Sequence, residues 1–339
     1  AATWGLVKDN WVLGVGPGNF VDALPRYQGE AFAVRVGTDF PADSPHLIPL
    51  QWLADGGVPL LLANLVLCCA VLWTGIRNIR RSSDKDEALF LVGAMAAACS
   101  FGLVLLTHFP SPGTSVIAGL SAGAIAAVVR SPAKQKAAAL RPAAALRTVP
   151  RTVPQMARAA SYVGAGGLIV LFVFAAAASL AENHMKAGDT AVRGGQLAAA
   201  SSQFEIAQSL RPWDTDVALL AGQDFAGRAA AGDPESGKFA AEWSARSLRL
   251  NPGSVESMTS LAVGQLATGD VQAARDTLAE AREVAPVNSQ VWLQSGLAAY
   301  AGGELDEAET FVERAVALTP DPAQLQPILT AIRQQTGQP

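Results

Sequence analysis

Two consecutive 34-residue stretches decide the fold of the C-terminal half. Residues 253–286 read GSVESMTSLAVGQLATGDVQAARDTLAEAREVAP, and residues 287–320 read VNSQVWLQSGLAAYAGGELDEAETFVERAVALTP. Each stretch ends in a proline (Pro286 or Pro320) after a run of apolar residues with helical spacing. A glycine, Gly269 or Gly303, interrupts each stretch near its middle. Each stretch therefore predicts two helices joined by a tight turn.

The same pattern extends toward the N-terminus. The interval from Pro252 to Pro286 equals the interval from Pro286 to Pro320, whereas the interval from Pro212 to Pro252 is longer, with the extra residues around Gly232–Gly237. Small residues recur at matching positions of the first helices, as at Gly188, Ala262 and Gly296. A 34-residue helix–turn–helix period is the signature of tetratricopeptide repeats.

We therefore predict an all-α solenoid of such repeats over residues 182–339, with residues 321–336 as a capping helix. His184 falls on a repeat position and is expected to be structural. Stacked repeats curve into a surface that binds a protein partner; the alternative is an array that acts only as a spacer.

Four long apolar runs precede the repeats, at residues 58–76, 88–107, 109–129 and 159–181. A bilayer core requires about 20 apolar residues of helix, so these runs predict transmembrane helices, three of them within residues 58–129. The third run is interrupted by prolines, and its helix is expected to begin near Thr114. The alternative is a set of buried helices in a soluble protein. All three cysteines (Cys68, Cys69 and Cys99) lie inside these runs and predict neither a disulfide nor a metal site.

Lysine and arginine are distributed unevenly between the runs. Residues 77–85 carry four bases, and residues 130–158 carry seven bases and no acid, whereas the turn at His108 carries none. Bases mark cytoplasmic loops, so we predict a basic cytoplasmic linker at 130–158 and a fourth transmembrane helix at 159–181. Residues 1–57 and 182–339 are then extracytoplasmic. The linker lacks aromatic residues, which argues against a nucleic-acid partner.

Residues 11–57 are neither an apolar run nor a repeat, and they hold the residues with chemical potential. They contain Gly14-Val-Gly16-Pro-Gly18-Asn-Phe20, then Arg26 and Arg35, then Pro45-His46, and finally Leu50-Gln51-Trp-Leu-Ala-Asp55-Gly-Gly57. The glycines do not form the G-x-G-x-x-G loop of dinucleotide-binding proteins, because Pro17 interrupts them and no βαβ unit follows.

The order of these elements resembles the O-antigen ligase and polymerase family of membrane glycan transferases. In that family a Gly-x-Gly-x-x-x-Phe motif precedes a large extracytoplasmic loop, and a histidine then begins a Leu-Gln-x-x-x-(Glu/Asp)-x-Gly segment before the next span. Gly14, Gly16, Phe20, His46 and Gln51 match this pattern, and Gly18 lies within the first motif. One residue departs from it: Leu47 stands where the family often has asparagine.

The resemblance implies transfer of a glycan from a polyprenyl-diphosphate carrier to a glycan or lipid acceptor, without a cofactor or a metal. In this interpretation His46 is the catalytic base, because an acceptor hydroxyl needs a base near neutral pH. Arg35 and Arg26 would bind the diphosphate, and Gln51 belongs to the same substrate-binding set. The alternatives are a His46 that only begins a helix, and arginines that are solvated loop charges.

Two functions therefore follow from the sequence. The first is the C-terminal part of a glycan transferase of the bacterial cytoplasmic membrane, whose repeat domain binds a protein partner. The second is a non-enzymatic, membrane-anchored repeat scaffold. The chain begins without methionine. We expect it to be the C-terminal part of a longer protein, and to be inactive as an enzyme by itself.

Overall fold

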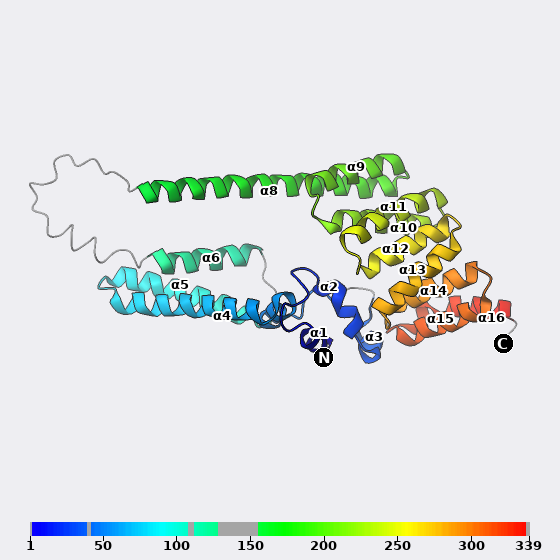
Figure 1. Cartoon of the computed structure of the whole chain (residues 1–339), viewed down its shortest axis with the longest axis horizontal. Coiled ribbons are helices and arrows are strands. Elements are labelled where there is room, and N and C mark those ends of the chain that lie inside the picture. The colour runs from blue at the N-terminus through cyan, green and yellow to red at the C-terminus, as the bar shows by residue number, and fades with distance from the viewer. Residues whose placement is uncertain (1, 39–41, 108–111, 128–154, 337–339) are drawn as a thin grey trace, which may run out of the picture. The chain divides into compact units, whose positions relative to one another are not determined.

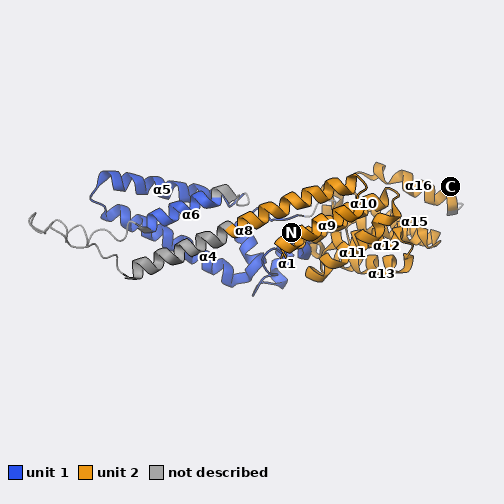
Figure 2. Ribbon diagram, turned by 90° about the horizontal axis from the view of Figure 1, so that it is seen from above, with its two compact units in different colours: residues 1–24, 42–152 blue, residues 25–41, 153–339 orange. Residues whose placement is uncertain are grey.

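The computed structural model describes residues 2–38, 42–107, 112–127 and 155–336, with only the backbone described for 112–114, 127, 155–172 and 336. The described residues are helices and connecting turns, without β-strands. They fall into two compact units (Figure 1; Figure 2). Unit 1 comprises residues 1–24 and 42–152, and unit 2 comprises residues 25–41 and 153–339. The expected extracytoplasmic loop, 1–57, is therefore divided between the two units.

Unit 1 contains the long apolar helices. Its elements are α1 (Ala2–Asp9), α2 (Phe20–Ala23), α4 (Ile48–Arg81), α5 (Lys85–Val104) and α6 (Pro112–Ala127). The α4 helix is kinked where Gly56 and Gly57 leave helical geometry. The Asp84 side chain caps α5 by accepting a hydrogen bond from the Asp86 amide at 2.9 Å. A buried Asn78 side chain donates to the Ile125 carbonyl at 2.9 Å and so joins α4 to α6.

Among the described residues, α4 and α5 are long and apolar enough to cross a membrane, judged by length and composition alone. The third expected span appears as the 16-residue α6, which begins two positions before the expected start. The fourth expected span lies within α8 (Gln155–Arg193), whose side chains up to residue 172 are not described. Residues 130–154 of the expected linker lie outside the described residues. Membrane insertion and orientation stay predictions.

Unit 2 contains a solenoid of helix pairs, as the sequence period predicts (Figure 1). The C-terminal part of α8 pairs with α9, and three further pairs and a terminal helix follow. Their bounds are α9 (Leu197–Leu210), α10 (Thr215–Ala230), α11 (Pro234–Leu250), α12 (Val255–Ala267), α13 (Val271–Val284), α14 (Ser289–Ala301), α15 (Leu305–Leu318) and α16 (Gln326–Thr336). Unit 2 also includes η1 (Leu24–Tyr27), apart from its first residue, and α3 (Glu30–Val36).

The extra residues of the second pair are shared between its two helices. The α10 helix has 16 residues against 13 in α12, and α11 has 17 against 14 in α13. The turn between α10 and α11 keeps a glycine with positive φ, Gly232, as the other pairs do at Gly195, Gly269 and Gly303. The insertion therefore lengthens the arms of the hairpin on either side of Gly232 and leaves its turn unchanged.

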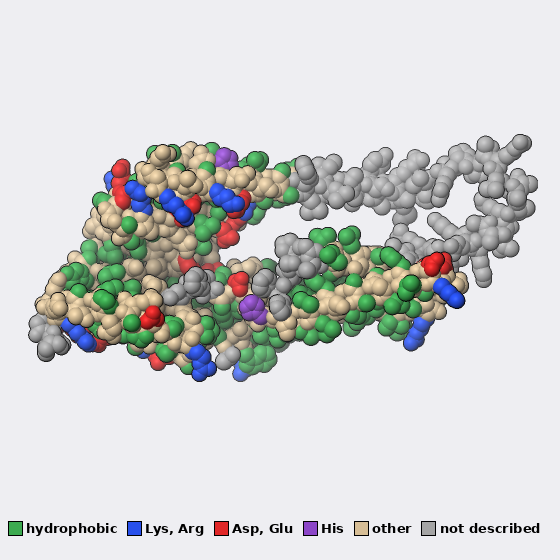
Figure 3. Space-filling model, turned by 180° about the vertical axis from the view of Figure 1, so that it is seen from behind, with side chains coloured by type: hydrophobic (Ala, Val, Ile, Leu, Met, Phe, Trp, Pro, Cys, Tyr) green, Lys and Arg blue, Asp and Glu red, His purple; other side chains and the backbone are tan. Residues whose placement is uncertain are grey.

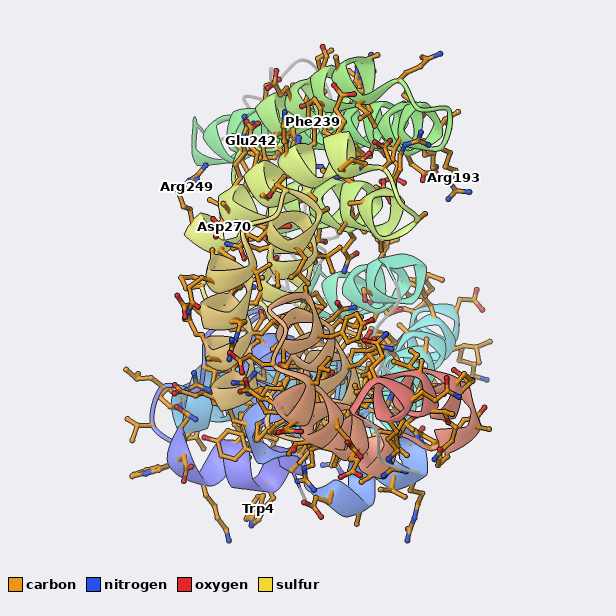
Figure 4. All side chains as sticks on the ribbon, turned by 90° about the vertical axis from the view of Figure 1, so that its right-hand side faces the viewer. Trp4, Arg193, Phe239, Glu242, Arg249 and Asp270 are labelled. Carbon is orange, nitrogen blue, oxygen red and sulfur yellow. The ribbon has the colours of Figure 1, made fainter. Side chains whose placement is uncertain are left out.

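Polar residues begin the repeat helices. Asp270, labelled in Figure 4, accepts a hydrogen bond from the Ala273 amide at 3.2 Å and caps α13. Asn288 caps α14 by accepting from the amides of Gln290 and Val291. At the other end of the array, His184 of α8 lies 2.7 Å from the Gln203 side chain of α9, which is the structural role expected for it.

Aromatic side chains fill the first half of the array. Phe204 makes edge contacts with Phe225 and Trp243, with ring centroids 6.0 and 5.9 Å apart. Phe239, labelled on α11 in Figure 4, stacks on Phe225 at 5.1 Å. The buried Trp243 ring donates its indole N–H to Ser201 at 3.1 Å. At the far end, Leu329 and Ile332 of α16 pack over α15, so α16 caps the core.

Close approach of paired helices requires glycine at some positions. A Cβ built on Gly222 of α10 would lie 2.5 Å from Ser244 Oγ and 3.2 Å from the Ser244 backbone nitrogen. Gly227 lies on the same helix with nothing within 4 Å of its Cβ position. The two glycines therefore separate the effect of packing from the effect of helix propensity.

We expect Gly222→Ala to destabilise the array by about 1–3 kcal/mol, because the new methyl group displaces α11. Gly227→Ala should instead stabilise it by about 0.5–1 kcal/mol, since alanine favours the helix. Urea unfolding of the repeat array, residues 182–336, measures both changes. Equal effects of the two substitutions would contradict the helix packing described here.

Candidate functional site

The two glycine-containing motifs of unit 1 meet each other. The Val15 amide donates to the Ala54 carbonyl at 2.7 Å, and the Gly16 amide donates to the Asp55 carbonyl at 2.9 Å. In the other direction, the Val58 amide donates to the Trp11 carbonyl at 2.9 Å. Three backbone hydrogen bonds thus join residues 11–16 to the kink of α4. We call this arrangement the glycine interlock.

The kink in α4 explains why these carbonyls need outside partners. In an unbroken helix the Ala54 carbonyl would accept from the Val58 amide, and the Asp55 carbonyl from residue 59. The Val58 amide is directed to Trp11, and Pro59 has no N–H. Because the helix cannot satisfy these two carbonyls, the amides of Val15 and Gly16 do so.

Glycine is required on both sides of the interlock. Gly14 has φ +66°, and a Cβ there would lie 2.5 Å from the Ala54 carbonyl oxygen. Gly57 has φ +63°, and a Cβ there would lie 2.3 Å from the Val12 carbonyl oxygen. Gly16 and Gly18 also have positive φ, but no backbone atom lies within 4 Å of either Cβ position. Phe20 is buried and anchors the end of the motif.

His46 lies on the exposed approach to α4, two positions before the helix begins. Its φ is +53°, an uncommon backbone conformation for a residue with a side chain. Its amide donates to Ser44 Oγ at 3.1 Å. Leu47 follows at the N-cap and offers no capping side chain, so the departure from asparagine removes a helix cap here.

Gln51 lies one turn into α4, on the side of the helix that carries Asp55. Its side-chain nitrogen donates to Asp55 Oδ1 at 2.8 Å. Its Oε1 atom is buried without a hydrogen-bond partner among the described residues. A buried acceptor without a donor costs free energy, so Gln51 can accept a hydrogen bond from a donor group of a ligand.

The expected arginines lie in unit 2. Arg26 is exposed in η1, and Arg35 is exposed in α3. The structure thus brings Gln51 and the glycines together in unit 1 and places His46 at the start of the same helix. It carries both arginines on the segment that belongs with the repeats. Among the described residues, no group of three or more His, Cys, Asp or Glu side chains is arranged to hold a metal.

Cavities lie between helices of the described part of the repeat array. A polar one of about 250 Å³ lies between α13 and α15, where the Arg282 guanidinium lies over the ring of Phe311 at 4.6 Å and donates to Ser295 Oγ at 2.7 Å. Burial lowers the pKa of Arg282 from its usual value, and the charge of Glu307 opposes this. A second, apolar cavity of about 380 Å³ lies between α14 and α16 beside Tyr300.

A carboxyl group in the first half of the array has an altered pKa. Burial, and then the charge of Asp189, raise the pKa of Asp224 from 3.8 to about 6, although Arg193 lowers it. Arg193, labelled in Figure 4, is itself bonded to Asp189 at 2.8 Å. The folded state therefore takes up a proton at Asp224 at a higher pH than the unfolded chain does.

Ionised Asp224 therefore destabilises the array above about pH 6, and this effect disappears as the pH falls toward 4. After allowance for partial exposure, we expect Asp224→Asn to stabilise the array by about 1 kcal/mol at pH 8. At pH 4 the variant and the native array should be equally stable. Urea unfolding of both at the two pH values measures the difference; a stabilisation that persists at pH 4 would exclude titration as its cause.

Comparison with known proteins agrees with the helix pairs. The family model for the tetratricopeptide repeat matches residues 259–323. The solved structure of TTC0263, a thermophilic TPR protein of Thermus thermophilus, is 21% identical over 46% of this chain and 83% of that chain, with a TM-score of 0.37. The structure of MamA of AMB-1 is 23% identical and covers 46% of this chain and 82% of its own, with a TM-score of 0.34. The structure of yeast Tom70 is 13% identical and covers 99% of this chain and 72% of its own, with a TM-score of 0.30. No curated protein sequence matches the chain.

Proposed function

We propose that this chain, which carries tetratricopeptide repeats, is part of a membrane glycan transferase similar to O-antigen ligases and polymerases. The glycine interlock is the observation that carries this proposal. The two sequence motifs on which the resemblance rests are separated along the chain by the segment that joins unit 2, and their backbones bond to each other. Such pairing is expected of two halves of one site.

The chemistry assigned to this site follows from its residues. His46 would accept a proton from the acceptor hydroxyl as the glycosidic bond forms. Gln51, with its unsatisfied Oε1, would accept a hydrogen bond from a sugar hydroxyl. The resemblance also implies that Arg35 and Arg26, which lie in unit 2, bind the departing diphosphate, since guanidinium groups bind phosphate through paired hydrogen bonds. The donor is then a lipid-linked glycan, and the acceptor a glycan or a lipid.

The surfaces of α4 and α5 support a membrane location. Only 6% of the apolar stretch of α4 and 11% of that of α5 is buried, so these helices are not the core of unit 1. Figure 3 shows apolar side chains along the long helices of this unit, with charged side chains gathered at the end where α4 turns into α5. Large side chains such as Trp73, Leu89 and Leu103 are exposed. Contiguous apolar surface of this extent is typical of contact with lipid.

The test is glycan transfer in cells that carry the native protein, with His46→Ala compared with wild type at matched membrane abundance. Loss of a general base lowers the rate by about 10²–10⁴-fold, so transfer should fall at least about 100-fold. Leu47→Ala is the matched control, because this exposed neighbour has no assigned chemistry, and it should retain transfer within about threefold of wild type. Unchanged transfer in His46→Ala would refute the catalytic assignment.

The second candidate is a non-enzymatic membrane scaffold. The repeat match favours it, since arrays of this type commonly present surfaces for protein partners. The lack of a capping side chain at Leu47, beside His46, also favours the scaffold. Unchanged glycan levels in His46→Ala cells, together with loss of an assembly when the repeats are deleted, would support the scaffold over the transferase.

A further inference from the structure

A segment from the N-terminal part of the chain packs on the last helix pair of the array. Residues 25–41 belong to unit 2, although the residues on both sides of them in the sequence belong to unit 1. Ala33 of α3 is fully buried in a cluster with Val287 and Leu318. Val287 lies just before α14, and Leu318 is the last residue of α15. Trp292 packs against the same cluster. The contact therefore has an apolar centre, formed by parts of the chain that are far apart in the sequence.

Polar contacts surround this centre. The Ser289 amide donates to Thr38 Oγ1 at 3.1 Å, and the Asn288 side chain donates to the Thr38 carbonyl at 3.4 Å. Glu30 forms an ion pair with Arg314 of α15. Thr38 is buried, so its hydroxyl bonds to the Ser289 amide, the first free amide of α14, instead of to water. The segment thus supplies a hydrogen-bond acceptor to a helix end that needs one.

The repeat period shows why the segment binds this pair and not its neighbour. The position of Arg314 is held one repeat earlier by Glu280, which would repel Glu30. The position of Val287 is held by Gly253, which offers no side chain to Ala33. Of these two pairs, the last one alone combines a base with an apolar residue at these positions. Two independent features, charge and apolar contact, therefore select the same pair.

We propose that the last helix pair of the array is a receptor for the chain's own segment, residues 25–38. In the sequence the segment lies between Phe20 of the first motif and His46 of the second, and docking fixes residues 25–38 to a folded surface. Arg26 and Arg35 are exposed on the docked segment, and the array therefore determines their positions. This inference holds whether or not the chain transfers glycans.

Cross-linking in the full chain tests the docking. With Cys68, Cys69 and Cys99 replaced by alanine, Glu30→Cys and Arg314→Cys are introduced together, and isolated membranes are treated with a short bismaleimide. The matched control pairs Glu30→Cys with Glu280→Cys, the same position of the preceding pair. Peptide mass spectrometry quantifies the intramolecular product. We expect at least about tenfold more product with Arg314→Cys than with Glu280→Cys, the ratio that corresponds to about 1.4 kcal/mol.

A second substitution in the same background links the product to the docked state. Ala33→Asp places a carboxylate in the apolar centre and should lower cross-linking about tenfold or more. Val34→Asp adds the same charge to the neighbouring residue, which is 48% exposed, and should leave it within about twofold. Equal cross-linking to both positions, or an Ala33→Asp product as abundant as the parent's, would overturn the proposal. Because no glycan is measured, loss of transferase activity cannot produce either result.

Discussion

Gly14→Ala is expected to open the glycine interlock. Alanine would have to adopt φ +66° with its Cβ 2.5 Å from the Ala54 carbonyl oxygen and the Gly56 nitrogen, all backbone atoms that cannot rotate away. The strained conformation costs about 1–3 kcal/mol, and displacement of the backbone adds a similar amount. We expect local stability to fall by about 3 kcal/mol, which lies in the lower half of the combined range of about 2–6 kcal/mol. Amide hydrogen exchange should then accelerate about 100-fold at Val15 and Val58.

Gly18→Ala is the control, because it shares the positive φ but meets nothing within 4 Å. It should carry only the conformational cost, about 1 kcal/mol, and accelerate exchange at Val15 less than about tenfold. If both substitutions gave the same exchange rates, the interlock would depend on backbone conformation alone. The close approach of Gly14 to α4 would then contribute nothing.

Trp243→Ala is expected to have the largest effect on the repeat array. The side chain is fully buried, contacts Phe204 and bonds to Ser201, so its removal leaves a cavity between α9 and α11 and deletes that hydrogen bond. Substitutions of this kind cost about 3–5 kcal/mol. The midpoint of urea unfolding of the array, residues 182–336, should fall accordingly, with an unchanged denaturant slope.

Trp213→Ala supplies the comparison within the same part of the array. Trp213 is 61% exposed, and its ring contact, Phe174 at a centroid distance of 5.3 Å, lies outside residues 182–336. Its loss should cost less than about 1 kcal/mol, because little apolar area returns to water. A Trp213→Ala variant as unstable as Trp243→Ala would show that the core lies elsewhere than the aromatic cluster around Phe204.

The repeats could be predicted from the sequence because their signals are local. The prolines that follow the second helix, the turn glycines and the small residues recur in each repeat, and each acts within its own hairpin. The same signals indicated the capping helix and the structural role of His184. Gly222 lies ten residues after Pro212, as Ala262 and Gly296 lie ten residues after Pro252 and Pro286, so the contact at Gly222 could also have been predicted from the repeat period.

The interlock was predictable only in part. Pro59 lies four residues after Asp55 and has no N–H, so the helix must leave the Asp55 carbonyl without an internal donor. No local rule shows which amides will satisfy that carbonyl, and the contacts of Val15 and Gly16 depend on tertiary structure. Docking of segment 25–38 was missed for the same reason, since its signal, Arg314 in place of Glu280, has meaning only after a distant partner is known.

The continuity of α8 is a further feature that the sequence analysis does not include. We predict a membrane helix at 159–181 and a repeat domain at 182–339, and one helix runs from Gln155 to Arg193 across the boundary between them. The sequence between them lacks proline, and Gly188 is accommodated because it lies against Phe204. Helix-forming residues on both sides of Ala181 therefore join the two segments without a boundary.

A single helix of 39 residues makes α8 a rod about 58 Å long. Each residue advances the helix by about 100°, so the number of residues between the apolar segment and the first pair fixes the direction in which the array faces. Insertion of one residue into this rod would turn the whole array by more than a quarter turn without altering any contact inside it. Evolution can change the length of a flexible linker freely, but here a change of one residue redirects the domain.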